Sequence, residues 1–331
     1  MFCPAIGDDR GSQRKFPMQP TDLSSSVALA DRRADYARML AGNGEHAGAA
    51  ELMEQALELA PEWPAGWFQL AGYREKSGDA PGAVIALRRV LLLDPGDMLG
   101  AGLRLGLLGA EPMPPQPPSR YVEALFDDYA GRFDASLVEA LDYRVPRKLA
   151  ALLTRIADRP ARFALAVDLG CGTGLVGREL RDRVDRLEGF DLSDNMLAKA
   201  GEKAIYDYLG RADLSLPACR SGVFAENLPP GRADLATAAD VMIYLGDLEN
   251  LFLLVSGLLA PGGLFAFSVE DSREAEGFAL LPSMRYAHSA AYIEALIERH
   301  GFAPLDREYT TLRKDGAEMV TGILFVAARN R

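Results

Sequence analysis

The sequence predicts an α/β protein in which an all-α segment precedes a largely parallel sheet that is closed by one antiparallel strand. Three observations predict this fold. Apolar strand patterns alternate with helical patterns from residue 163 onward. The chain ends in two strand patterns joined through Asp315-Gly316, a strong hairpin signal. A helical pattern before residue 110 recurs after 34 residues. Alternating strands and helices imply a sheet covered by helices on both faces.

Composition restricts the classes of function. The chain has 331 residues, 49% of them apolar, and 36 basic against 47 acidic residues give a net charge of −11. This length predicts two domains, and the negative charge argues against a nucleic-acid partner. The longest near-apolar run, 251–260, is about half of a bilayer span, so we expect no membrane segment. Cys3, Cys171 and Cys219 form no CxxC pair, which favours a reducing, cytoplasmic location.

Residues 1–20 are rich in Gly, Pro and charge and are interpreted as a tail, while the repeated pattern occupies 21–110. The positions that coincide are Tyr36 and Leu70, Ala37 and Ala71, Gly44 and Gly78, Glu45 and Asp79, Ala49 and Ala83, Met53 and Leu87, Ala56 and Val90, and Pro61 and Pro95. Small residues let the two helices of a hairpin approach closely, glycine permits the turn, and proline ends the second helix.

The second copy, with Trp67 and the ending Asp94-Pro95, resembles the tetratricopeptide repeat. Residues 97–109 are expected to add a third, incomplete helix. Such a segment either forms a peptide-binding groove or serves as a scaffold or self-association surface. Two repeats make only a small concave face, which favours the second interpretation.

Five prolines in 111–119 predict a stiff linker and a domain boundary, so the second domain covers 120–331. Helical periodicity runs from 121 to 158, interrupted at Pro146. The later strand patterns cover 163–168, 187–191, a short stretch ending at Asp213, 233–239, 264–270, 302–312 and 318–328, and the helical patterns cover 175–184, 194–206, 247–259 and 289–300.

A glycine-rich segment, LAVDLGCGTGLVG, follows the first of these strands. Gly172, Gly174 and Gly177 have GxGxxG spacing, which is also typical of dinucleotide-binding folds. Asp168 separates the two interpretations, because a carboxylate two residues before Gly170 would repel a pyrophosphate across a low-dielectric gap. The same carboxylate suits the ammonium end of S-adenosylmethionine, met directly or through water.

DLGCGTG followed by GFDLSDNML resembles the cofactor-binding half of class I S-adenosylmethionine-dependent methyltransferases, over about 120–331. With the repeats in front, the chain resembles predicted bacterial methyltransferases that contain tetratricopeptide repeats. The resemblance implies a Rossmann-like sheet of seven strands with the last one antiparallel. It also implies S-adenosylmethionine as cofactor, S-adenosylhomocysteine as product and no metal. An NAD oxidoreductase is the rival.

The resemblance assigns cofactor contacts by position. Asp191 would accept hydrogen bonds from both ribose hydroxyls, or else cap the next helix, for which Asp194 is better placed. Leu192 and Met196 would enclose the adenine, although a Met at helical spacing is also typical of core. Asp213 would bind the adenine amino group or only form a turn. The other candidates are Asp168, Gly170, Cys171 (through its backbone), Gly172, Gly174, Ala239 and Asp240.

The methyl acceptor is expected beyond the carboxyl ends of the strands, where Asp240, Tyr244 and Glu270 would line the mouth of the site, with Tyr244 alternatively a wall residue. His288 titrates near neutral pH and Arg285 can pair with a carboxylate, although His288 could instead cap the helix at Ser289. The catalytic candidates are His288, Tyr244 and Glu270, and the substrate-binding candidates are Tyr129, Tyr143, Arg144, Arg285 and Tyr286.

In similar enzymes the helices corresponding to 120–158 form a lid, although aromatic residues at helical spacing are equally typical of core. The sequence thus predicts a methyltransferase that acts on oxygen or nitrogen of a small, polar or carboxylated acceptor. Two alternatives remain open. The enzyme could methylate a protein that the repeats present, or the repeats could recruit a partner while the sheet binds cofactor without turnover.

Overall fold

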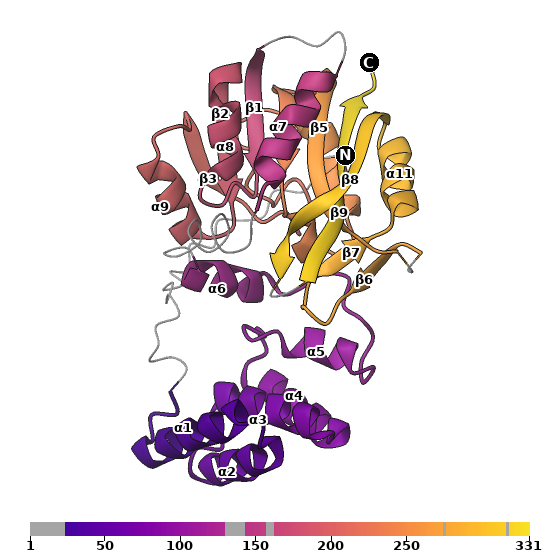
Figure 1. Ribbon diagram of the computed structural model, residues 1–331. Coiled ribbons are helices and arrows are strands. Elements are labelled where there is room, and N and C mark those ends of the chain that lie inside the picture. Colours follow the sequence, from indigo (N-terminus) through magenta and orange to yellow (C-terminus); the bar gives the residue numbers. More distant parts are fainter. Residues whose placement is uncertain (1–23, 130–142, 157–161, 274–275, 316–317) are drawn as a thin grey trace. The chain divides into compact units, whose positions relative to one another are not determined.

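The computed structural model describes residues 24–129, 143–156, 162–273, 276–315 and 318–331 (Figure 1). The chain divides into two compact units, which meet in sequence between Ala124 and Leu125. Helix α6, Ser119–Tyr129, contains this boundary. The predicted tail and Cys3 lie outside the described residues. None of the helices in the described ranges combines the length and the apolar character that crossing a bilayer requires.

The N-terminal unit consists of helical hairpins. Its helices are α1 Ala28–Gly42, α2 His46–Leu59, α3 Pro64–Ser77, α4 Ala80–Leu93 and the short α5 Ala101–Leu107. The starts and the ends of α2 and α4 are both 34 residues apart, since 80 − 46 and 93 − 59 are equal. Gly44 and Gly78 form the turns with φ angles of 85° and 89°. The hairpins and their repeat length are as predicted.

Side chains and prolines fix the limits of these helices. Asp79 caps α4 by accepting a hydrogen bond from the backbone N–H of Gly82. Asp97 caps α5, because its Oδ1 and Oδ2 accept from the backbone N–H groups of Ala101 and Gly102 at 2.6 and 2.8 Å. After α5 the predicted linker region contains no regular element until α6 begins at Ser119.

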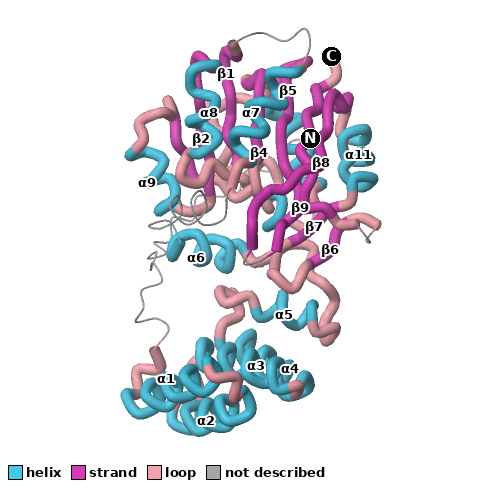
Figure 2. Tube along the Cα trace, in the orientation of Figure 1, coloured by secondary structure: helices cyan, strands magenta, loops and turns pink. Residues whose placement is uncertain are grey.

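The second unit is built on one mixed sheet (Figure 2). Its strands are β1 Phe163–Leu169, β2 Val184–Asp191, β3 Tyr208–Arg211, β4 Ala233–Ala238, β5 Leu259–Asp271, β6 Phe278–Leu280, β7 Tyr286–His288, β8 Phe302–Asp315 and β9 Glu318–Arg329. Parallel strands follow the order β3-β2-β1-β4-β5, and β9 pairs antiparallel with both β5 and β8. The antiparallel closing strand is therefore confirmed.

The predicted count of seven strands is wrong, because the described residues contain nine. The additional pair is the hairpin of β6 and β7, in which β7 runs parallel to the end of β5. Each of these strands has three residues, which is too short for an alternating pattern to be recognised in the sequence. The hairpin extends the carboxyl end of β5, where the acceptor site is expected.

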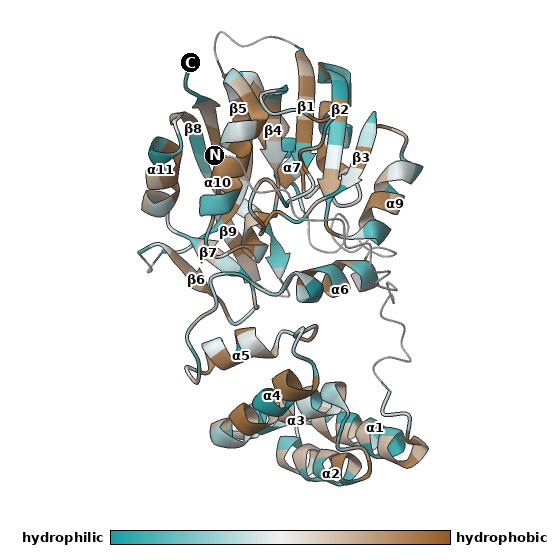
Figure 3. Ribbon diagram, turned by 180° about the vertical axis from the view of Figure 1, so that it is seen from behind, coloured by the Kyte–Doolittle hydropathy of each residue, from teal (hydrophilic) through white to brown (hydrophobic). Residues whose placement is uncertain are grey.

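Helices cover both faces of the sheet. On one face lie α7, Val145–Arg155, and α8, Leu175–Leu180, and on the other lie α10, Glu249–Leu258, and α11, Ala290–Arg299. Most of α10 is hydrophobic (Figure 3). The expectation of a lid over 120–158 is wrong for α7, because Leu149, Leu152 and Leu153 are almost fully buried against the sheet.

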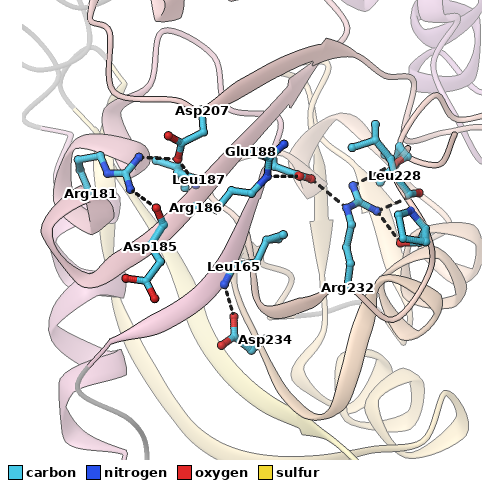
Figure 4. Close-up of polar contacts among 12 residues, drawn as sticks. Leu165, Arg181, Asp185, Arg186, Leu187, Glu188, Asp207, Leu228, Arg232 and Asp234 are labelled. Carbon is cyan, nitrogen blue, oxygen red and sulfur yellow. Dashed lines mark hydrogen bonds and ion pairs between the residues drawn. The ribbon is translucent and has the colours of Figure 1, made fainter. Parts of the chain in front are cut away.

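Ion pairs and backbone contacts connect β1, the middle of β2 and the start of β4 (Figure 4). Glu188 on β2 accepts from Arg186 at 3.0 Å and from Arg232, just before β4, at 2.9 Å. Asp234 accepts the backbone N–H of Leu165 at 2.8 Å, which joins the starts of β4 and β1. These contacts lie away from the carboxyl ends of the strands and therefore position the sheet rather than the site.

Candidate functional site

The glycine-rich loop between β1 and α8 has the backbone that the sequence predicts. Gly170, Gly172 and Gly174 have φ angles of 65°, 53° and 90°, a region that residues with a Cβ rarely adopt. A Cβ at Gly170 would lie 2.3 Å from Cγ2 of Val241. The backbone N–H of Cys171 donates to the carbonyl of Phe190 at 2.9 Å, which ties the loop to the end of β2. The N–H of Cys171 is thus used within the protein, and its contact with the cofactor stays a prediction.

Asp191, the last residue of β2, binds the same loop. Its Oδ2 accepts from the backbone N–H of Gly172 at 2.8 Å and its Oδ1 from that of Ser193 at 2.9 Å. Burial raises the pKa of Asp191 to about 6, although these N–H groups oppose the shift. Ser193, rather than Asp191 or Asp194, caps helix α9, Asp194–Glu202, by accepting from the N–H of Met196. The capping role considered for Asp191 is therefore wrong.

Asp168 is predicted to meet the ammonium group of the ligand either directly or through water, and the structure does not favour the direct contact. It is 1% exposed, and its oxygens accept hydrogen bonds from the Tyr206 hydroxyl at 2.7 Å and the Thr237 hydroxyl at 2.8 Å. Burial raises its pKa to about 6. A direct contact with an ammonium group is therefore absent from this arrangement, because both oxygens are turned to protein hydroxyls. The carboxylate can still act on a ligand through its charge.

The other residues predicted to contact the cofactor differ in their exposure and in their hydrogen bonds. Met196 is fully buried, so the alternative of a core residue is confirmed and a contact with adenine is not. Leu192 and Ala239 remain partly exposed. Asp213 Oδ1 accepts from the backbone N–H of Ser215 at 3.0 Å and from its hydroxyl at 2.6 Å, which is the turn considered as the alternative.

A cluster of charges lies at the carboxyl ends of β4 and β5. Arg313, from β8, donates from Nη1 to Asp240 Oδ2 at 2.5 Å and from Nη2 to Glu270 Oε1. Arg285 Nε donates to the same Glu270 oxygen at 3.0 Å. The side chains of Arg313 and Glu270 are 6% and 4% exposed. Asp240, Glu270 and Arg285, which the sequence places at this mouth, are therefore brought together.

The backbone of Asp240 is strained, and hydrogen bonds to Ser268 on β5 hold the residue in place. Its φ of 54° lies in the left-handed region, which a residue with a Cβ occupies at a cost. Its backbone N–H donates to the Ser268 hydroxyl at 2.8 Å, and that hydroxyl donates to Asp240 Oδ1 at 3.1 Å. Strand β5, which contains Ser268, thus fixes the direction of the carboxylate, and Arg313 compensates its charge.

Two tyrosines adjoin this cluster. Tyr143 is buried, and burial together with the nearby charge of Asp240 raises its pKa well above the ordinary value, so its phenol stays protonated. Tyr244 is partly buried and meets Phe126 edge to face with ring centroids 5.0 Å apart. A cleft of about 470 Å³ lies beside Tyr143 and is lined by Tyr143, Arg144, Pro146, Arg147, Leu175, Arg178 and Glu179. Tyr143 and Arg144 thus line a cleft, and their contact with the acceptor stays a prediction.

Two residues proposed for the acceptor site are wrong. His288 is fully buried in β7, its Nε2 lies 3.0 Å from the carbonyl oxygen of Gly246, and burial lowers its pKa to about 4. Tyr286 in the same strand is also fully buried. Ser289, not His288, caps α11. Tyr129 is the last residue of α6, and the position of its side chain lies outside the description.

Two residues of the candidate site were not predicted. Arg313 lies beyond the predicted end of its strand at 312, and the register of β8 shifts between Thr311 and Arg313, so that both Leu312 and Arg313 are buried. Tyr206 lies after the true end of α9 and fills the space above Gly177 and Gly189. A buried arginine breaks the alternation of a strand, and this break was the one available signal for Arg313.

The fold and this site define an α/β domain of the kind that holds a nucleoside cofactor at the carboxyl ends of its strands. A methyltransferase-domain family matches residues 141–306, half of the chain. The chain belongs to this family, whose enzymes transfer methyl groups, and its cofactor is S-adenosylmethionine.

Curated relatives cover part of the same region. Trans-aconitate 2-methyltransferase of Streptomyces avermitilis is 32% identical over 161 residues, which are 47% of this chain and 56% of that protein. Malonyl-[acyl-carrier protein] O-methyltransferase of Enterobacter lignolyticus is 30% identical over 122 residues, 37% of this chain and 44% of that protein. The chain thus spans about half the length of the curated relatives it matches. A solved S-adenosylmethionine-dependent methyltransferase from Mesorhizobium loti is 25% identical, with a TM-score of 0.42 over 55% of this chain and 96% of that one.

The buried acids fit a cationic cofactor. Asp168 is held by two hydroxyls and Asp191 by two backbone N–H groups, so uncharged donors surround both carboxylates. Buried negative charges held in this way favour a ligand that carries positive charge. The ammonium and sulfonium groups of S-adenosylmethionine supply it, whereas a diphosphate would add repulsion.

Proposed function

We propose that the chain methylates a carboxylate oxygen of a small acidic acceptor. The observation that supports this is Arg285, whose guanidinium lies at the carboxyl end of β5 and is 19% exposed, while the buried Arg313 beside it compensates the charges of Asp240 and Glu270. Guanidinium groups have five N–H donors and recognise carboxylates in pairs of hydrogen bonds. The names of the relatives support this class of acceptor, because trans-aconitate and malonyl groups carry carboxylates.

The cofactor half of the site would use residues already described. Both oxygens of Asp191 accept backbone N–H groups, and a carboxylate oxygen can accept more than one hydrogen bond, so the ribose hydroxyls can bind there as well. The backbone at Gly170 and Gly172 would lie against the ligand without a side chain between them. Leu192 would contact the adenine. When bound, the cofactor supplies a methyl group on a positively charged sulfur.

The state of the site's titratable groups favours a carboxylate as nucleophile. A hydroxyl or ammonium acceptor must lose a proton, and the expected bases are not available for this, because His288 is buried and Glu270 is bound by two arginines. A carboxylate is already deprotonated at neutral pH. Its oxygen would attack the methyl carbon as the carbon–sulfur bond breaks, and the electron pair of that bond stays on sulfur.

The protein would contribute alignment and a dry environment. Arg285 would hold the acceptor in line with the methyl group, and the neutral phenol of Tyr143 can donate a hydrogen bond beside it. Positive sulfur and negative oxygen become neutral products, so the transition state carries less charge than the reactants. A low-dielectric site therefore favours the reaction.

The test measures S-adenosylhomocysteine formed with a panel of carboxylic acids, alcohols and amines. We expect turnover with carboxylic acids, and the KM for the acid should rise about 10- to 100-fold in Arg285→Ala while cofactor affinity is unchanged. Arg273→Ala, an exposed arginine 70% accessible on its side chain, is the matched control. Turnover with amines and not with acids, or an unchanged KM in Arg285→Ala, would contradict the proposal.

A second role is supported by the 34-residue period of the hairpins in the N-terminal unit. This period is that of the tetratricopeptide repeat, a protein-binding architecture. In this role the repeats recruit a protein, which is either the methyl acceptor or an accessory partner. Labelled methyl groups from S-adenosylmethionine, followed in a lysate, distinguish the two functions, because they would appear in protein rather than in small molecules.

A further inference from the structure

The internal repeat shows that positions buried in the second hairpin of the N-terminal unit are exposed in the first. A shift of 34 residues superimposes Leu29 on Trp63 and Tyr36 on Leu70 in the sequence. In the second hairpin, Trp63 and Leu70 are 6% and 0% exposed. In the first hairpin, their counterparts Leu29 and Tyr36 are 51% and 61% exposed. Equivalent positions are therefore core in one copy and surface in the other.

The difference arises from what each helix packs against. Helix α3 packs on α2 of the preceding hairpin, where the methyl of Met53 would lie 2.9 Å from a Cβ at Gly66. Helix α1 has no preceding hairpin among the described residues. Its outer face, here named the α1 face, consists of Leu29, Arg32, Tyr36 and Met39, and Met39 is 65% exposed. The opposite side of α1 is buried through Ala30, Ala34 and Ala37.

The α1 face does not fit another hairpin of the same kind. The position of Gly66, where α2 and α3 approach closely, is taken by Arg32 in the first copy. At Gly66 a Cβ would meet the Trp63 ring of the same hairpin at 2.4 Å and the methyl of Met53 on α2 at 2.9 Å, so Arg32 at the equivalent position disfavours a contact with another hairpin of the same kind. The α1 face suits a partner that packs against its apolar side chains and places a negative charge opposite Arg32.

A second copy of the chain supplies that charge. Arg32 and Asp35 are both exposed and lie about one helical turn apart on α1. Asp35 already accepts from Arg38 Nη1 of the same helix at 2.8 Å, but this pair is exposed and therefore weak, so the carboxylate can also pair with a facing Arg32. When two α1 helices pair antiparallel about a two-fold axis near Ala34, Arg32 of each lies beside Asp35 of the other, and Leu29 lies beside Met39. We propose that the α1 face is a homodimer interface in which α1 pairs antiparallel with α1 of a second copy. The contact is isologous, so it closes at two copies.

Sedimentation of the full-length chain between about 1 and 100 µM tests the proposal. We expect a dimer that dissociates on dilution, and at least a tenfold weaker association in Tyr36→Glu and Met39→Glu. Ile85→Glu and Leu92→Glu on α4 are matched controls, because these side chains are 63% and 68% exposed but lie outside the α1 face. Circular dichroism checks that all four variants fold.

Charge reversal tests the orientation. Arg32→Glu should weaken the dimer, and the double variant Arg32→Glu with Asp35→Arg should restore it, because each pair is re-formed with its signs exchanged. A chain that begins at residue 24 tests the remaining alternative, in which residues 1–23 of the same chain cover the α1 face. A monomeric full-length chain that dimerises only after this truncation would show that residues 1–23 cover the face. That result, a wild type that stays monomeric at about 100 µM, or equal weakening in the α4 controls, would overturn the proposal.

Discussion

Arg313 Nη1 donates to Asp240 Oδ2 at 2.5 Å, although 73 positions separate the two residues in the chain. Arg313 comes from the edge hairpin of β8 and β9, while Asp240 follows β4 in the middle of the sheet. Glu270 at the end of β5 completes the contact. One buried guanidinium thus joins three parts of the sheet that are distant in the sequence, at the place where the acceptor is expected.

Removal of this guanidinium should destabilise the domain strongly. Arg313→Ala leaves the carboxylates of Asp240 and Glu270 buried without their main counter-charge, and breaking a buried ion pair from one side costs about 3–5 kcal/mol. Urea denaturation measures the free energy of unfolding. Arg307→Ala on the same strand is the control, because that ion pair is half exposed and should contribute about 0–1 kcal/mol. Equal losses in the two variants would show that the cluster has no special role.

Asp191→Asn should reduce the affinity for S-adenosylmethionine about 10- to 100-fold, since the amide loses the charge and one acceptor for the ribose hydroxyls. The neighbour Asp194 is exposed in the first turn of α9 and provides the control Asp194→Asn. Isothermal titration of both variants with S-adenosylmethionine and S-adenosylhomocysteine measures the effect. An affinity in Asp191→Asn equal to that of the control would exclude Asp191 from the cofactor site.

Cofactor affinity should depend on pH through the two buried acids. Burial raises the pKa values of Asp168 and Asp191 to about 6, so both are partly protonated near pH 6 in the free protein. A cation prefers the deprotonated acids, and binding therefore strengthens as pH rises through 6 and levels off above about pH 7. Below pH 6 the affinity should fall about tenfold per pH unit for each acid coupled to the ligand. Titration calorimetry from pH 5 to 8 tests this, and an affinity independent of pH would contradict it.

The variant Tyr206→Phe distinguishes whether Asp168 or Asp191 causes the pH dependence of cofactor affinity. The Tyr206 hydroxyl stabilises the charged form of Asp168, so its removal should raise the pKa of Asp168 further and move the midpoint of the affinity curve to higher pH. The aromatic ring that packs on Gly177 and Gly189 is kept in this variant. Tyr208→Phe, on the neighbouring strand β3, should leave the midpoint unchanged. A shift in the control of the same size would assign the effect to packing rather than to the hydrogen bond.

The sequence predicts those features that depend on local chemistry. Positive φ angles at Gly170, Gly172 and Gly174 follow from residue type, and the place of Asp191 follows from strand order, because carboxyl ends of parallel strands meet at one edge. The hairpins follow from the repeat length. The glycine conformations need only one turn, whereas the place of Asp191 and the hairpins follow from patterns that recur along the chain.

Features that depend on long-range packing could not be predicted. Whether the carboxylate of Asp168 meets a ligand or a hydroxyl is decided by Tyr206, whose direction depends on where α9 ends. Met196 could belong to pocket or core, since both place an apolar side chain on the same helix face. His288 belongs to a three-residue strand that forms only against β5, so its burial has no local signature.

His288 provides a last test, because the structure makes it a core residue instead of a base. Burial lowers its pKa to about 4 from an ordinary 6.5, so unfolding takes up a proton between these values, and His288 makes the free energy of unfolding fall as pH drops from 6.5 to 4. His288→Phe should remove this contribution and should cost about 1–3 kcal/mol at pH 8 through the unpaired carbonyl of Gly246. The kcat of the folded variant should stay within about threefold of wild type. Denaturation at pH 5 and 8 and steady-state kinetics measure both effects. A loss of kcat above about 100-fold with intact cofactor affinity would show that the imidazole takes part in catalysis.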